Sequence, residues 1–154
     1  MATAAMPSAP ERGTILAFDF GTRRIGVAVG EQATRIAHPL TTIASEKSAE
    51  RFATIAALID EWRPALLLVG LPTHADLSEH QMTTRARRFA RQLAGRFGIQ
   101  VALVDERYST RTAAEALSTT GVKTREHRRV RDRVAAQLIL QTYLDQHGSP
   151  QRVA

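Results

Sequence analysis

The sequence contains no cysteine among its 154 residues. Disulfide bonds, thiolate metal ligands and cysteine nucleophiles are therefore excluded. Aromatic residues are scarce, with five Phe, two Tyr and one Trp, and none is interleaved with the basic runs, so the sequence does not favour base stacking on single strands. The longest apolar run, Ala65–Leu71, is far shorter than the roughly 18 residues that a membrane span needs. No membrane partner is expected.

Acidic residues are outnumbered by basic ones. The chain has 21 Lys and Arg against 15 Asp and Glu, a net charge of +6 and a pI near 10.9. A basic surface favours polyanionic partners, nucleic acid first. Only Lys47 and Lys123 are lysines, and the planar guanidinium of arginine suits phosphate groups. A genomic bias toward arginine codons is the alternative explanation of this composition.

The length predicts one domain, which we expect to cover residues 13–147. Residues 1–12 lack the apolar segment of a secretory signal and an Arg-rich transit pattern, and their small residues and prolines predict a disordered arm. Residues 148–154 are expected to form a flexible tail. Because no export signal is present, we expect a cytoplasmic protein.

Hydrophobic periodicity predicts a mixed α/β sheet with helices on both faces. The first three strands follow one another through short connections, so they are expected to pair antiparallel, and Pro39 suggests an edge or irregular position in the third. The last two strands each follow a helix, which favours parallel crossovers. The expected strands are 14–20, 25–29, 35–43, 65–71 and 100–104, and the expected helices are 47–62, 78–97, 110–118 and 129–146, the last preceded by a basic loop at 121–128.

One carboxylate stands out of place in the first expected strand. Asp19 shares a strand face with Ile15 and Ala17 and lies two residues before Gly21. Asp is depleted in strands and costly to bury alone, so a compensating group is expected. The alternative is that Asp19 caps the turn around Gly21. Gly26 and Gly30, in the next strand, do not form a dinucleotide fingerprint.

A second carboxylate lies on the apolar stripe of the last expected helix. Asp132 stands at the N-terminal end of this stripe, and two small alanines after it would let the helix approach the sheet closely. The alternative is a helix-start Asp favoured by the helix dipole, with neighbouring arginines as exposed partners. The other members of the stripe are Ala135, Ala136, Ile139 and Tyr143.

A third carboxylate is expected at the end of the last strand, where Asp105 and Glu106 follow one another. Their side chains point to opposite faces, so at most one can join Asp19, and spacing leaves both open. Three converging acids repel one another unless a divalent cation lies between them. Mg²⁺ prefers hard oxygen ligands, and two such ions about 4 Å apart activate a water and stabilise the leaving oxygen in phosphodiester cleavage.

Basic residues surround these acids in the sequence. A cation beside a metal-binding acid is unusual unless a polyanion is being attracted. Arg107 could equally form a salt bridge with a neighbour, and the arginines of helix 78–97 could form a solvated face. The residues expected to contact nucleic acid are Arg23, Arg24, Arg107, Lys123, Arg125, Arg128 and Arg129.

Four motifs in order resemble the YqgF/RuvX family over about residues 13–146. They are AFDFGTRRIGVAV (17–29), LLVGLP (67–72), VDERYST (104–110) and RDRVAAQLILQTYLD (131–145). The resemblance implies an RNase H-like fold with sheet order 3-2-1-4-5. The family is described as a Holliday junction resolvase and, in bacteria, as the nuclease that matures the 5′ end of pre-16S rRNA.

The resemblance also implies the site residues. Asp19, Glu106 and Asp132 would be both the catalytic residues and the ligands of Mg²⁺ or Mn²⁺, with two ions expected. Glu106 is thus preferred over Asp105 by resemblance alone. The chain departs from the family pattern at Asp76-Leu77-Ser78, where the family shows a D-G-S-like turn, and at Arg133, where it has a small residue. Neither departure affects the three acids.

The expected function is that of a metal-dependent endonuclease which processes the 5′ end of pre-16S rRNA, with the ribosomal particle as a further partner. One alternative is a Holliday junction resolvase acting on branched DNA, which would be expected to dimerise. Monomer and homodimer both remain open. Another alternative is a non-catalytic nucleic-acid-binding module. An actin-like ATP-binding protein is disfavoured because such proteins need two similar domains.

Overall fold

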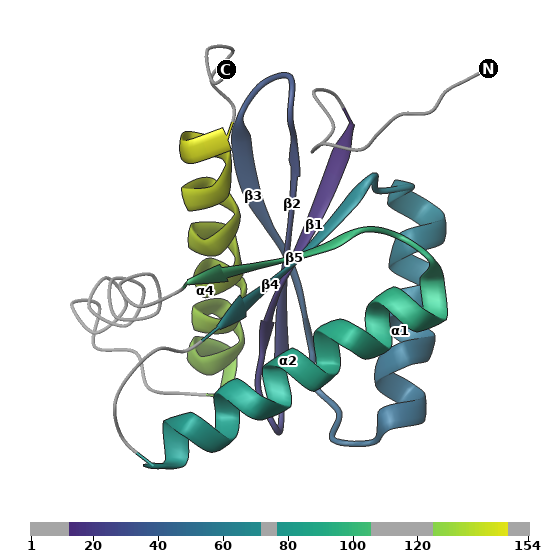
Figure 1. The fold of residues 1–154 in the computed structure, drawn as a ribbon. Coiled ribbons are helices and arrows are strands. Elements are labelled where there is room, and N and C mark those ends of the chain that lie inside the picture. The colour runs from purple at the N-terminus through teal and green to yellow at the C-terminus, as the bar shows by residue number, and fades with distance from the viewer. Residues whose placement is uncertain (1–12, 72–76, 106–124, 148–154) are drawn as a thin grey trace.

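The fold is a five-stranded sheet with helices on both faces, as the sequence predicts (Figure 1). It is seen in a computed structural model that describes residues 13–71, 77–105 and 125–147. The strands are β1 (Thr14–Phe20), β2 (Ile25–Glu31), β3 (Ile36–Ile43), β4 (Leu66–Leu71) and β5 (Val101–Asp105). The helices are α1 (Ser48–Trp62), α2 (Leu77–Phe97) and α4 (Arg125–His147). The arm, the tail and the helix expected at 110–118 lie outside the described residues.

The strand order is β3-β2-β1-β4-β5, which confirms the order that the resemblance implies. The pairs β1–β2 and β2–β3 are antiparallel, whereas β1–β4 and β4–β5 are parallel. Strand β3 forms one edge, and its register against β2 shifts between Val27 and Ala28, opposite Pro39. A proline lacks the N–H that a central strand would need, so its position at an irregular edge fits the prediction.

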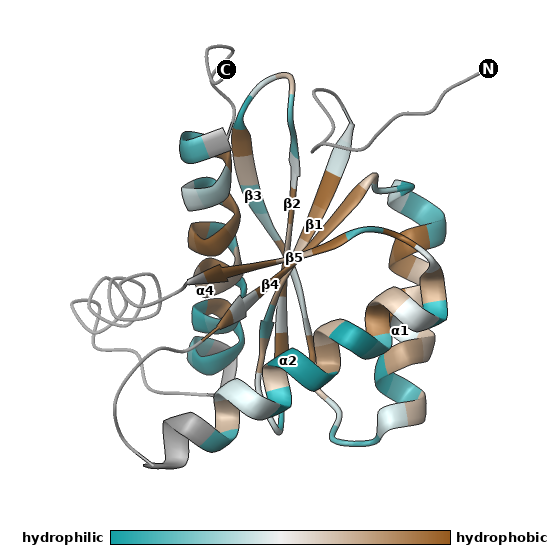
Figure 2. Ribbon diagram, in the orientation of Figure 1, coloured by the Kyte–Doolittle hydropathy of each residue, from teal (hydrophilic) through white to brown (hydrophobic). Residues whose placement is uncertain are grey.

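The central strands are apolar on both faces because helices cover both sides of the sheet (Figure 2). Leu16 and Phe18 of β1 pack on the side of α1 and α2. Ile15 and Ala17, the alternate residues of the same strand, pack on the side of α4. The face of β1 that carries Asp19 is therefore the α4 face.

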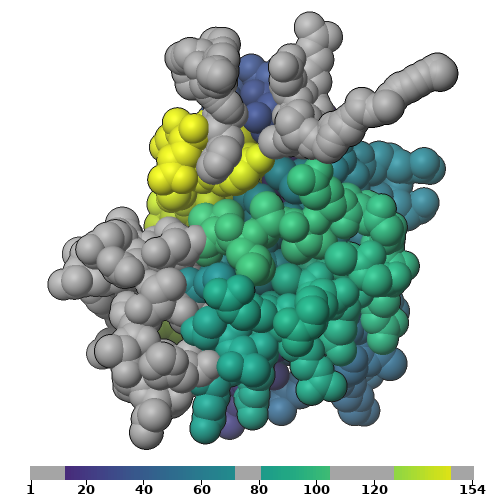
Figure 3. Space-filling model, viewed as in Figure 1, coloured from purple at the N-terminus to yellow at the C-terminus, as the bar shows by residue number. Residues whose placement is uncertain are grey.

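The α1 and α2 side is centred on Phe89. Its ring lies 5.9 Å from that of Phe18, 4.9 Å from that of Phe20 and 6.0 Å from that of Phe52, measured between centroids. Helix α2 and strand β5 form much of the face seen in Figure 3. The arginines of α2 are exposed, as a solvated face requires: Arg85, Arg87, Arg88, Arg91 and Arg96. The guanidinium of Arg96 lies over the Phe52 ring at the edge of this core, 4.0 Å from its centroid.

Helix α4 begins earlier than the sequence indicates. We expected a basic loop through residue 128 and a helix from residue 129, but the helix starts at Arg125. The expectation was wrong because Arg and Glu are good helix formers, so a run of charged residues does not by itself indicate a loop. Arg125 and Arg128 are thus helical residues. Among the described helices, none is long and apolar enough to cross a membrane.

Candidate active site

Three residues form a row across the first three strands at the end of β1. Asp19 of β1 pairs with Gly26 of β2, and Gly26 pairs with Thr42 of β3. Helix α4 packs over this side of the sheet (Figure 1). A part of α4 that contacts Gly26 and Thr42 therefore lies next to Asp19.

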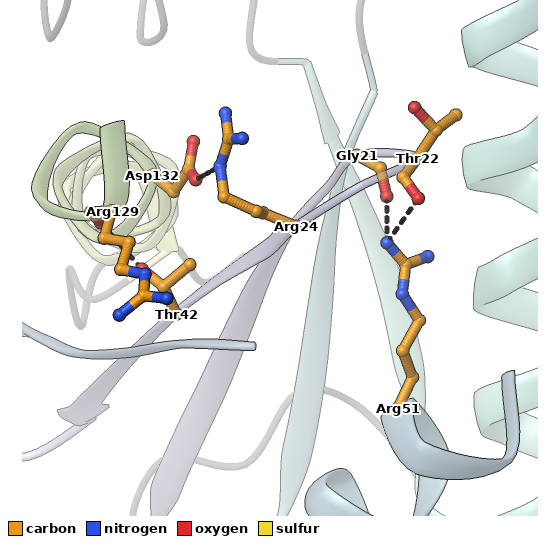
Figure 4. Close-up of polar contacts among 7 residues, drawn as sticks. All are labelled: Gly21, Thr22, Arg24, Thr42, Arg51, Arg129 and Asp132. Atoms are coloured by element: carbon orange, nitrogen blue, oxygen red, sulfur yellow. Dashed lines mark hydrogen bonds and ion pairs between the residues drawn. The ribbon is translucent and has the colours of Figure 1, made fainter. Parts of the chain in front are cut away.

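Gly26 is the point at which α4 comes closest to the sheet. A Cβ atom built on Gly26 would lie 1.9 Å from the carbonyl oxygen of Asp132 and 3.1 Å from its Cβ. Any side chain at residue 26 would therefore collide with the helix backbone. Beside it, the Thr42 hydroxyl donates a hydrogen bond of 2.7 Å to the carbonyl of Arg129 (Figure 4). The absence of a side chain at Gly26 and the hydrogen bond from Thr42 thus position the helix turn that carries Asp132.

The two aspartates line one pocket. This pocket has a volume of about 280 Å³, and it is formed by the end of β1, the β1–β2 turn, α2 and α4. Asp19 is half-buried, and the side chain of Asp132 is 14% exposed. The stripe of α4 is buried as predicted, from Ala135 to Tyr143. The structure therefore brings together two of the three predicted acids. The other lining residues are Phe20, Gly21, Thr22, Arg23, Arg24 and Met82.

Asp132 is paired with Arg24. The Nε of Arg24 donates to Oδ2 of Asp132 at 2.5 Å (Figure 4). The alternative view of Asp132 as a helix-start residue expected Arg131 and Arg133 to be exposed partners. Both are half-buried on α4. The partner comes from the β1–β2 turn, 108 residues away in the chain. The charge of Asp132 is thus balanced across the fold.

A second, basic pocket adjoins the first. It has a volume of about 380 Å³ and shares Arg23 and Arg24 with the pocket of the aspartates. Arg128 and Arg129 of α4 line its other side. Four of the predicted nucleic-acid contacts therefore surround one hollow beside the acids. Ala44, Ser45 and Glu46 complete its lining.

Three of the remaining predicted site residues lie in a part of the chain that the structure does not describe. Glu106, Arg107 and Lys123 lie outside the described residues. Arg125 is the first residue of α4, and Asp105 pairs with Leu71 at the end of β5. Within the described ranges, no three acidic or histidine side chains gather into a metal-binding cluster.

Arg51 of α1 is a site residue that the sequence analysis missed. Its side chain is buried, and its Nη2 donates to the carbonyls of Gly21 and Thr22 at 2.7 and 2.8 Å (Figure 4). Its Nε donates to the carbonyl of Ser45 at 2.5 Å. One guanidinium therefore joins the β1–β2 turn, which carries Arg23 and Arg24, to the segment after β3.

The burial of Arg51 has an electrostatic cost. Desolvation lowers the pKa of its guanidinium, and the nearby carboxylate of Glu46 opposes that shift. The guanidinium also lies over the Phe20 ring, 5.5 Å from the centroid. The sequence carried a signal for this role, because Arg51 adjoins Phe52 and precedes Ile55 by four residues. A charged residue at the edge of an apolar stripe was the same signal that identified Asp132.

Replacing Gly26 tests the close approach of α4. We expect Gly26→Ala to lower the free energy of unfolding by about 1–3 kcal/mol or more, because the new methyl group overlaps the backbone at Asp132. Urea unfolding measures this change. Gly95→Ala is the matched control, since Gly95 lies in α2 with nothing within 4 Å of an added Cβ. The control is expected to be neutral or slightly stabilising; equal losses in both variants would contradict the account.

Replacing Arg51 tests the support of the turn. Arg51→Gln leaves the carbonyls of Gly21 and Thr22 without their donor, so we expect a loss of about 1–3 kcal/mol in the free energy of unfolding. Faster amide hydrogen exchange should be confined to the β1–β2 turn and the segment after β3. Arg88→Gln removes the same charge from an exposed position of α2 and should change little. Unaltered exchange in Arg51→Gln would refute this role.

Comparison with known proteins places the chain in a family. A family model described as "RuvX: Holliday junction resolvase" matches residues 13–146. A protein of Nitrosospira multiformis is 50% identical over 149 residues, which cover 97% of this chain and 99% of the relative. A protein of Nitrosomonas europaea is 57% identical over 133 residues, which cover 86% of this chain and 90% of the relative. Both relatives are named "Putative pre-16S rRNA nuclease".

A solved structure shares the fold. The structure titled "T. thermophilus RuvC in complex with Holliday junction substrate" matches with a TM-score of 0.55 at 14% identity, covering 85% of this chain and 92% of that one. This likeness supports the predicted RNase H-like fold. The match of the family model over nearly the whole chain, together with relatives at half identity or more, confirms the resemblance of the four motifs. The chain belongs to the RuvX family.

Proposed function

We propose that this protein is a metal-dependent endonuclease that hydrolyses phosphodiester bonds at the 5′ end of pre-16S rRNA. The observation that carries the proposal is the pair of carboxylates, Asp19 and Asp132, which line one pocket from two distant parts of the chain. Beside them lies a hollow lined by four arginines. Acids and cations placed in this way suit a polyanion that is to be cleaved rather than merely held.

The donor set fits a divalent cation. Mg²⁺ and Mn²⁺ prefer carboxylate oxygens, and Mg²⁺ keeps several waters, so two or three carboxylates and a substrate phosphate suffice. Asp19 and Asp132 would hold the metal together with Glu106, and two ions are proposed. When bound, the metal supplies a water activated for attack and charge that stabilises the leaving oxygen. The protein's own part is to place the carboxylates around one pocket.

The register of β5 supports Glu106 as the third acid over Asp105. Ala102 and Val104 belong to the apolar cluster on the α4 side of the sheet. Glu106 continues these even-numbered positions in the sequence, whereas Asp105 belongs to the odd-numbered positions. Asp19 and Asp132 lie on the α4 side, so the proposal takes Glu106 as their companion.

The arginines are proposed to bind the substrate backbone. Arg23, Arg24, Arg128 and Arg129 surround the basic pocket, and their guanidinium groups suit bidentate contacts with phosphate. Binding of this kind depends on backbone and shape, so its affinity should fall steeply with salt. Arg107, Lys123 and Arg125 are proposed to extend the contact by their positions in the sequence.

The substrate is proposed from the relatives. Proteins at 50–57% identity carry the name of a pre-16S rRNA nuclease, so we favour an rRNA precursor, with the ribosomal particle as a partner and a cytoplasmic location. The description of the family model supports a second candidate, a resolvase of Holliday junctions. Symmetric cleavage of a junction requires two active sites, hence a homodimer. The non-catalytic module is the third possibility.

The proposal is tested by cleavage of two labelled substrates, a precursor rRNA 5′-leader fragment and a four-way DNA junction, with Mg²⁺ or Mn²⁺ and with EDTA. We expect the RNA to be cut near the mature 5′ end. Asp19→Asn and Asp132→Asn should each lower the rate at least about 100-fold, because loss of even supporting groups at metal sites costs 10–100-fold. EDTA should abolish cleavage.

Asp60→Asn is the matched control, because Asp60 is an exposed acid of α1 with 84% of its side chain accessible. It should retain full activity. Symmetric cuts in the junction with the RNA left intact would favour the resolvase instead. Binding of both substrates without cleavage of either would favour the non-catalytic module. Activity that survives Asp19→Asn would overturn the metal site.

A further inference from the structure

We propose that Arg24 is the counterion of Asp132 in the metal-free enzyme and that a divalent cation must displace it. The displaced guanidinium then serves the neighbouring basic pocket, where it binds a substrate phosphate. This inference rests on the proposed function, because it takes Asp132 as a metal ligand. It goes beyond that function by making Arg24 a competitor of the metal and a partner of the substrate.

The ion pair is close and sheltered. The Nε–Oδ2 distance is 2.5 Å, and the two side chains are 25% and 14% exposed. Hydrogen bonds between a guanidinium and a carboxylate are among the strong ones because both groups are charged, and limited solvent access reduces their screening. A carboxylate at this depth needs a partner when no metal is present. Arg24 supplies that partner and also reduces repulsion between Asp132 and Asp19.

The same carboxylate oxygen cannot serve both groups fully. A metal draws the charge of Asp132 to itself, and the guanidinium would then face a cation of higher charge in the same 280 Å³ pocket. Arginine and metal therefore compete for Asp132. The cost of breaking the ion pair is subtracted from the affinity of the metal.

Arg24 has a second place to bind. It lines both pockets, and the basic one also contains Arg23, Arg128 and Arg129. A phosphate in that pocket would attract the guanidinium once Asp132 is taken by the metal. Binding of the metal and binding of the substrate should therefore strengthen each other. Each of them lowers the cost of separating Arg24 from Asp132.

The proposal predicts that Arg24→Gln raises the affinity for Mn²⁺ and lowers the affinity for nucleic acid. In the absence of nucleic acid, Arg24→Gln should bind Mn²⁺ about tenfold more tightly than the unaltered protein, the fold-change expected for removing one charge-assisted competitor. Calorimetric titration of the full chain with Mn²⁺ measures this affinity without any reaction. The same variant should bind the rRNA leader fragment more weakly than the unaltered protein in Ca²⁺-containing buffer, where a divalent cation takes Asp132 and releases Arg24. In EDTA-containing buffer, where Arg24 stays paired with Asp132, the two proteins should differ less.

Arg23→Gln is the matched control. Arg23 lines the same two pockets, so the variant loses the same charge while the bond between Arg24 and Asp132 stays intact. It should weaken nucleic-acid binding and raise Mn²⁺ affinity much less than Arg24→Gln. Arg24→Lys keeps the charge but lacks the planar fork, so its gain in Mn²⁺ affinity should be smaller; it also serves if the glutamine variant does not fold.

The outcomes separate this inference from the proposed function. Mn²⁺ binding that Asp132→Asn abolishes, with no gain in Arg24→Gln and Arg24→Lys, would overturn the role of Arg24 and leave the metal site standing. Equal gains in Mn²⁺ affinity in Arg23→Gln and Arg24→Gln would show that the loss of any nearby positive charge suffices. That result would also overturn the role of Arg24. Mn²⁺ binding unaffected by Asp132→Asn, or absent from every variant, would overturn the metal site and with it both proposals.

Discussion

The close approach of α4 to Gly26 is the constraint on which the site depends. Because residue 26 has no side chain, the backbone of Asp132 rests directly on β2, opposite the strand position that pairs with Asp19. The hydrogen bond from Thr42 to the carbonyl of Arg129 holds the same helix turn from β3. Two acids that are more than a hundred residues apart thereby line one pocket. The register of β1 against β2 places Asp19, and the contact of α4 with Gly26 places Asp132.

Arginines then make this arrangement of acids tolerable. Arg24 neutralises Asp132, and Arg51 holds the carbonyls of the turn from which Arg24 extends. The two cations have different tasks. Arg51 is buried and bound to backbone oxygens, which makes it a structural support, whereas Arg24 lies between two pockets and can exchange one anionic partner for another.

Much of the fold could be predicted from the sequence, because apolar periodicity and short connections leave few arrangements of five strands. The positions of Asp19 and Asp132 beside the buried residues of their elements could also be predicted, since each is a charge on an apolar face. Other features could not be predicted. Alternation places Asp105 and Glu106 on opposite faces without saying which face meets α4, so only the family resemblance selected Glu106. The role of Gly26 depends on a helix packed against it from distant sequence, and the charged first turn of α4 resembles a loop.

The most direct test of the account is a crystal of the protein soaked in Mn²⁺ and measured at the manganese absorption edge. The account predicts an anomalous peak in the pocket between Asp19 and Asp132, within coordination distance of both carboxylates, and an Arg24 side chain that has left Asp132. A structure in which manganese binds elsewhere, while the bond between Arg24 and Asp132 persists, would contradict the central claim that this pocket is a metal centre.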